Sequence, residues 1–116
     1  MHHLPNLTIA ALLDHAEARL PPCGVPAARA YLADAAARVA VVEMPAPQDS
    51  EEHAALGAIL GLEMRERAAV LAVIQLPAGG GLVALHGLDR EGAEVARRFV
   101  APRKAHDDAE MRLSTR

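Results

Sequence analysis

The chain has 116 residues, which is enough for one domain with a hydrophobic core of its own. Trp is absent and Phe and Tyr occur once each, so the core must be built from small and aliphatic side chains. The formal net charge of −3 and the scarcity of aromatic rings argue against a nucleic-acid partner, and the single cysteine excludes an intrachain disulfide and fits a reducing compartment.

Residues 7–20 allow two interpretations. Four apolar residues recur at helical spacing, and the alanines favour a helix. Residues 8–13 are also apolar and uncharged, so a strand is the alternative. The following run, 21–26, contains three prolines and one glycine and predicts a loop that carries the cysteine. The helical stripe consists of Leu12, Leu13, Ala16 and Leu20.

A seven-residue motif occurs twice. Val39-Ala-Val-Val-Glu-Met-Pro45 returns as Leu71-Ala-Val-Ile-Gln-Leu-Pro77. Each copy is rich in β-branched residues and ends at a proline, which predicts buried strands over 39–44 and 70–76.

The remaining pattern predicts three helices and a hairpin. Residues 27–38 and 50–66 are expected to be helical, with Ser50 as the N-cap of the second. Glycines at 57 and 61 would let that helix approach a sheet closely. Three glycines at 79–81 predict a hairpin between 70–76 and a strand over 82–88. A last helix is expected over 89–100, with Val95, Ala96, Phe99 and Val100 as its packing stripe and Arg97, Arg98, Arg103 and Lys104 near its C-terminal end.

These elements predict a single α/β domain over residues 1–102 and a polar tail over 103–116. The expected core is a small three- to four-stranded mixed sheet flanked by helices. The strands over 39–44 and 70–76 would form a parallel pair joined by the 50–66 crossover helix, and the 82–88 strand would add antiparallel. The alternative is an all-helical dimeric interaction protein in which 27–44 and 50–76 are each one helix.

The order of elements resembles the thioredoxin-like fold. The matching parts are Pro22-Cys23-Gly24-Val25-Pro26 at a helix start, the parallel strand over 39–44, the hairpin over 70–88, and Gly87 followed by a last helix. The resemblance implies a thiol at position 23 at the start of a helix, where the helix dipole lowers a thiol pKa. Pro26 stands where that family has its second cysteine, and residues 67–69 lack its proline, so dithiol–disulfide exchange is not expected.

Other candidate site residues are few. The histidines, at positions 2, 3, 15, 53, 86 and 106, show no metal-ligand spacing, so we expect no metal. His86 is expected to be a half-buried strand residue, opposite Ala72 in a register that pairs Leu76 with Leu82. The glycines at 79–81 lack the Lys-Ser/Thr of a phosphate-binding loop, and no serine has a catalytic setting, so we expect no cofactor.

The sequence therefore predicts a small non-catalytic protein-binding module, of adaptor, assembly or regulatory type, rather than an enzyme. Its protein partner is not identified, and a homodimer is possible. Residues 68–88 carry no formal charge, but Pro77 and the glycines interrupt them, so a cytoplasmic protein with no membrane partner is expected. The alternative function is a single-cysteine redox protein acting through Cys23.

Overall fold

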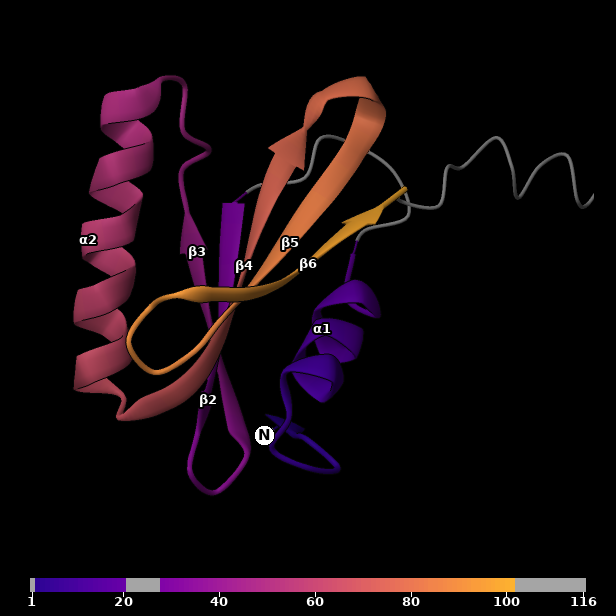
Figure 1. Ribbon diagram of the computed structural model, residues 1–116, viewed down its shortest axis with the longest axis vertical. Helices are drawn as coiled ribbons and strands as arrows, with labels where there is room; N and C mark the ends of the chain where they lie inside the picture. The colour runs from indigo at the N-terminus through magenta and orange to yellow at the C-terminus, as the bar shows by residue number, and fades with distance from the viewer. Residues whose placement is uncertain (1, 21–27, 102–116) are drawn as a thin grey trace, which may run out of the picture.

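The computed structural model describes residues 2–20 and 28–101. These residues form one six-stranded, fully antiparallel sheet with strand order β1-β3-β2-β4-β5-β6, and two α-helices cover it (Figure 1). The elements are β1 (His2–His3), α1 (Ile9–Glu17), β2 (Ala28–Asp34), β3 (Arg38–Met44), α2 (Ser50–Glu66), β4 (Ala69–Ala78), the 3-10 turn η1 (Gly79–Gly81), β5 (Leu82–Leu88) and β6 (Glu94–Val100).

The repeated motif forms strands as predicted, but the two strands are not neighbours. β2 lies between β3 and β4 and pairs antiparallel with both. Tyr31 of β2 opposes Val41 on one side and Val73 on the other, which are equivalent positions of the two copies. The predicted parallel pair, the three- to four-stranded mixed sheet and the thioredoxin-like arrangement are therefore wrong. The all-helical alternative is wrong as well, because both copies lie in strands.

The predicted helix over 27–38 is wrong because residues 28–34 form the central strand β2 and Arg38 begins β3. Ala28, Ala30 and Ala33 are fully buried between the two helical layers, where a larger side chain would push a helix away from the sheet. Alanine's helix preference is a weak bias that tertiary burial overrides. Asp34 and Arg38 do form an ion pair, with 3.0 Å between Oδ2 and Nε, but they form it across the β2–β3 turn.

The predicted helix over 89–100 is also wrong. Asp89 begins a turn instead, because its Oδ1 accepts hydrogen bonds from the backbone N–H groups of Glu91 and Ala93. The chain then returns as β6, which pairs with β5 and forms one edge of the sheet. On this strand Val95 and Phe99 are exposed rather than packed.

The helix favoured over 7–20, with a strand as the alternative, and the helix predicted over 50–66 are both present, as α1 and α2. Thr8 caps α1 by accepting a hydrogen bond from the N–H of Ala11 at 3.2 Å. The cap of α2 is Asp49 rather than Ser50, since its Oδ1 accepts from the N–H of Glu52 at 2.9 Å. Neither of these described helices is long and apolar enough to cross a membrane.

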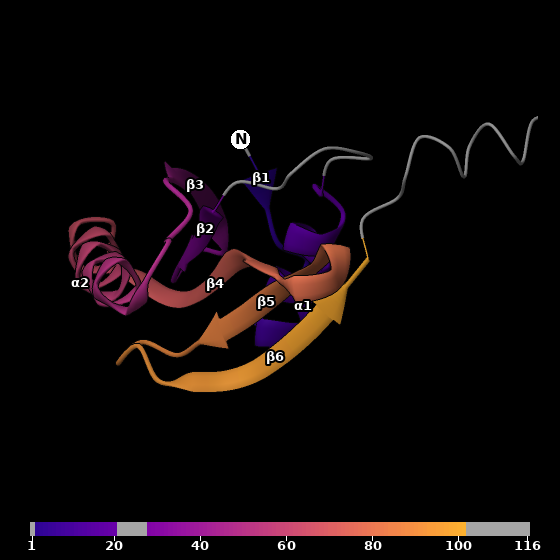
Figure 2. The ribbon, with the colours of Figure 1, turned by 90° about the horizontal axis from the view of Figure 1, so that it is seen from above.

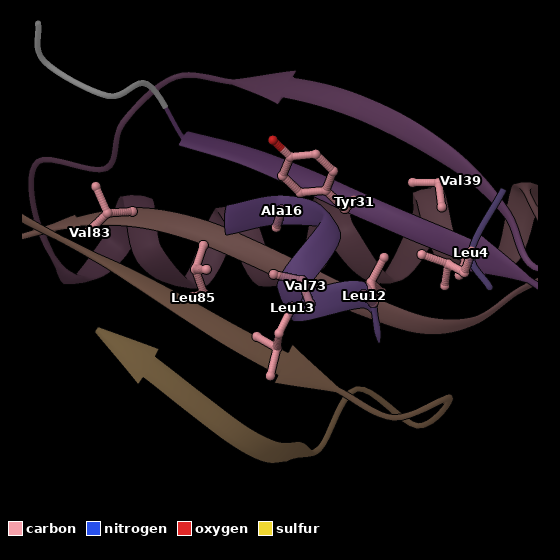
Figure 3. Close-up of a cluster of buried hydrophobic side chains, with 10 residues drawn as sticks. Leu4, Leu12, Leu13, Ala16, Tyr31, Val39, Val73, Val83 and Leu85 are labelled. Atoms are coloured by element: carbon pink, nitrogen blue, oxygen red, sulfur yellow. The ribbon is translucent and has the colours of Figure 1, made fainter. Parts of the chain in front are cut away.

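The two helices lie on opposite faces of the twisted sheet, and each face has its own core (Figure 2). Side chains alternate between the faces along each strand. The α1 core contains Leu4, Leu12, Leu13, Ala16, Tyr31, Ala33, Val39, Val73, Val83 and Leu85 (Figure 3). The α2 core contains Ala28, Ala30, Leu32, Met44, Leu56, Leu60, Met64, Ala72 and Ile74.

The hairpin between β4 and β5 is confirmed, with a different register. Leu76 opposes Ala84, and Leu82 opposes Ala78, so the strands pair right up to the glycines. The turn depends on those glycines because Gly80 has a φ of 72°, a left-handed conformation that other residues seldom adopt. The shift in register places His86 opposite Ile74 rather than Ala72.

Candidate binding groove

An apolar groove of about 230 Å³ lies between α2 and the outer strands, on the α2 face of the sheet. We call it the α2 groove. A side chain added at Gly57 would meet no atom within 4 Å, so the expected close approach of this glycine to the sheet is wrong: it leaves open space instead. The groove is lined by His53, Leu56, Gly57 and Leu60 of α2, Ile74 and Leu76 of β4, His86 and Leu88 of β5, and Glu94 of β6.

The register of three strands brings a polar cluster to the wall of the groove. On β5, His86 opposes Arg97 of β6, and its neighbour on the same face, Leu88, opposes Glu94. The Nδ1 atom of His86 lies 2.5 Å from Oε1 of Glu94, and Nη2 of Arg97 donates to Oε2 at 2.8 Å. Glu94 is thus held between an imidazole and a guanidinium.

These contacts favour the ionised form of Glu94. The hydrogen bond from His86 is the main cause that lowers the pKa of Glu94 below its ordinary value, and the hydrogen bond from Arg97 adds to it. An ionised carboxylate accepts hydrogen bonds, which assigns the proton to Nδ1 of the imidazole. Nε2 is then the ring atom that remains for a ligand. His86 is half-buried on a strand, as predicted.

The groove does not assemble a catalytic set. A carboxylate–imidazole pair can move a proton, but it needs a nucleophile or a bound water to act on. No Ser, Thr, Cys, Tyr or Lys side chain is among the residues that line the groove. Within residues 2–20 and 28–101, no group of three or more His, Cys, Asp or Glu side chains could hold a metal ion. The lining is suited to apolar contact with one polar anchor.

A second group of histidines lies on the α1 face. The ring of His15 packs edge-on against Tyr31, with centroids 5.9 Å apart, and against His2 at 5.6 Å. Burial is the main cause that lowers the pKa of His15, and the charges of Arg19 and His2 lower it further. His15 therefore behaves as a neutral packing residue under the sheet, and we assign it no ligand.

The residue singled out by the sequence, Cys23, lies outside the described residues, as do His106, Arg103 and Lys104. The redox alternative therefore stays a prediction. Sequence reasoning missed the contribution of Glu94 and Arg97, because it placed them on a helix, where they would not meet His86. The apolar residues of this segment, at 95, 96, 99 and 100, are spaced as on a helix, so the local pattern gave no signal for a strand.

Comparisons with protein families, with curated proteins and with solved structures found no match to this chain. The functional argument therefore depends on the geometry of the described residues.

Proposed function

We propose that this protein is a small non-catalytic protein-binding module, of adaptor, assembly or regulatory type, and that the α2 groove receives an apolar segment of its partner. The supporting observation is an open apolar groove whose only assembled chemistry is a hydrogen-bonded His86–Glu94 pair. A cytoplasmic location is part of the proposal and is supported by the presence of a single cysteine.

The size of the groove favours a protein partner over a small-molecule ligand. Cofactor and metabolite sites usually enclose about 300–1,000 Å³, whereas this groove measures about 230 Å³. That volume suits one or two aliphatic side chains presented by a larger partner. Exposed apolar residues continue beyond the groove on β5 and β6, where Leu82 and Phe99 extend the surface available to a partner chain.

The polar residues in the wall of the groove indicate which polar contact the bound segment can make. Glu94 already pairs with His86 and Arg97, so it is a poor partner for a further cation. Nε2 of His86 is available for a hydrogen bond with the partner's main chain, which would set the register of the bound segment. We therefore expect an apolar peptide with branched side chains, anchored by one main-chain hydrogen bond.

The experiment uses two matched substitutions on one helix. Gly57→Leu fills the groove, whereas Gly61→Leu makes the same change on α2 at a position outside it. A phage-displayed library of random peptides is selected on the full chain, and the enriched peptides are titrated against both variants by calorimetry. We expect apolar peptides whose affinity falls at least tenfold in Gly57→Leu and is unchanged in Gly61→Leu.

Peptides that bind both variants equally would place the binding surface elsewhere and overturn the proposal. A library that yields no peptide sensitive to Gly57→Leu would overturn it too. Circular dichroism and urea unfolding of both variants establish that each is folded before binding is compared.

A further inference from the structure

α2 carries a second apolar stripe that faces away from the sheet. Its inner face buries Leu56, Leu60 and Met64, as expected for a helix on a sheet. On the outer side Ile59 is 44% exposed and Leu62 is 49% exposed. Two exposed alanines, Ala55 and Ala58, complete the stripe. A helix with only one buried face normally presents charged and polar residues to water, so a stripe of this kind indicates an interaction surface.

The outer side of α2, which contains this stripe, has three rows of residues along the helix. In each row the residues are seven positions apart. The middle row holds Ala55 and Leu62, one flank holds Glu51, Ala58 and Arg65, and the other flank holds Glu52, Ile59 and Glu66. Residues seven apart lie nearly above one another because seven residues make almost two turns. In Figures 1 and 2, α2 forms one side of the molecule, and its outer side faces no other element.

These rows fit a second copy of the same helix in antiparallel orientation. A two-fold axis that passes between Ala58 and Ile59 brings each flank against the same flank of the other copy. Leu62 then packs over Ala55 of the second copy, so that a large side chain fills the space above a small one. Ala58 meets its own counterpart and allows close approach, and Ile59 packs against Ile59.

Charge is compatible with the antiparallel arrangement, which the packing of Leu62 over Ala55 favours. Glu51 and Arg65 lie on one flank, and neither side chain has a hydrogen bond or ion pair within the described part of the chain. Antiparallel packing brings Glu51 of each copy to Arg65 of the other, which forms two ion pairs. On the other flank, Glu52 would lie near Glu66 of the second copy, a repulsion that weakens association without blocking it. Parallel packing would place Glu51 near Glu52 and Arg65 near Glu66 of the second copy, again one repulsion and one attraction, but it would stack Leu62 on Leu62 and Ala55 on Ala55 and lose the packing of a large side chain over a small one.

We propose that two copies of the protein associate through antiparallel packing of α2 against α2. A helix of 17 residues is about 25 Å long. Specific interfaces bury roughly 1,200 Å² or more, and we expect the surface buried by one such helix pair to be near or below that lower limit. The dimer is therefore weak and depends on concentration. It leaves the α2 groove open, because the groove lies along the inner face of the helix, and each dimer presents two grooves.

Sedimentation equilibrium of the full chain, from about 10 µM to about 1 mM, measures the association. We expect a monomer–dimer equilibrium in which Leu62→Glu weakens association at least tenfold. Val95→Glu is the matched control, since it introduces the same carboxylate at an exposed apolar residue on β6. A monomer over the whole range would overturn the proposal. So would a dimer that tolerates Leu62→Glu, or one that Val95→Glu breaks, which would place the interface on β6.

Charge reversal tests the orientation with substitutions that do not threaten folding. Glu51→Arg and Arg65→Glu alone each weaken the dimer, and the double variant restores it. Glu66→Arg strengthens the dimer because it removes the repulsion with Glu52. Failure of the double variant to recover affinity would rule out the antiparallel register.

Disulfide trapping gives a second readout. In a Cys23→Ser background, Ala58→Cys places a thiol next to the two-fold axis, and oxidation is expected to trap a covalent dimer. Ala54→Cys changes the same residue type on the same helix at an exposed position outside the three rows, and it should trap far less. Equal trapping at both positions would contradict the arrangement. Gly57→Leu should leave the dimer intact, so failure of the groove proposal and failure of this one are distinguishable.

Discussion

Gly87 on β5 lies directly beneath the first turn of α1, and an added methyl group there should destabilise the protein. A Cβ at this position would lie 2.6 Å from Cγ1 and 2.9 Å from Cδ1 of Ile9. Carbon atoms prefer to be about 3.5–4.0 Å apart, so Ile9 or the helix would have to move by roughly 1 Å. Overpacking of this degree costs about 1–3 kcal/mol.

The same substitution has a favourable part. Alanine loses less conformational freedom than glycine on folding, which offsets about 0.5–1 kcal/mol of the cost. The net loss for Gly87→Ala is therefore about 0–2.5 kcal/mol, a fall in Tm of up to roughly 20 °C for a domain of this size. In an Ile9→Ala background the two contacting atoms are gone, and Gly87→Ala should become neutral or slightly stabilising.

Urea unfolding followed by far-UV circular dichroism measures the four free energies of this cycle, since the chain has no Trp to report by fluorescence. Gly57→Ala serves as the control, because its Cβ meets nothing within 4 Å, and it should stabilise α2 by up to about 1 kcal/mol. An equal cost of Gly87→Ala in both backgrounds would refute the packing of α1 on β5 through Ile9.

Two further predictions concern the backbone and the pH response. Ala68, just after α2, has a φ of 52°, a left-handed conformation that costs about 1–2 kcal/mol for residues other than glycine. Ala68→Gly should raise the free energy of unfolding by about 0.5–1 kcal/mol in urea, and a loss of stability would show that this strain is absent. The pKa of Glu94 is lowered by His86 and Arg97 in the folded state, so its stabilising effect is complete above its ordinary value of 4.5 and is lost as the pH falls through the lower, folded value. Wild type should thus lose more stability than Glu94→Gln between pH 5 and the acid limit of folding, and parallel pH profiles would contradict this linkage.

Local sequence signals predicted the elements whose residues agree with their setting. The two heptapeptides are β-branched and form strands, and α2 has a capping position, acidic residues in its first turn and an apolar stripe. Gly80 marks the hairpin turn because its backbone conformation requires it. In each case the preference of the residues and the tertiary environment point in the same direction.

The candidate groove could not be predicted from the sequence because it depends on contacts between elements that are far apart in the chain. It combines side chains from one helix and three strands, and its polar wall exists only because β6 pairs with β5. Residues 94–100 were predicted as a helix, a placement in which Glu94 and His86 would not meet. The spacing of residues on one element does not specify which atoms of a neighbouring element they will contact.

The sequence by itself determined where the strands of the repeat and α2 lie and where the hairpin turns, since these depend on contacts between residues close in the chain, whereas for α1 it left a strand open as the alternative and it did not foresee that Val41 of β3 is exposed. Only the tertiary structure decided that residues 28–34 are the central strand between the two copies of the repeat and that residues 94–100 are an edge strand. Alanine is compatible with either helix or strand, and at Ala28, Ala30 and Ala33 the choice is made by burial between two helical layers, an effect of packing across the whole domain.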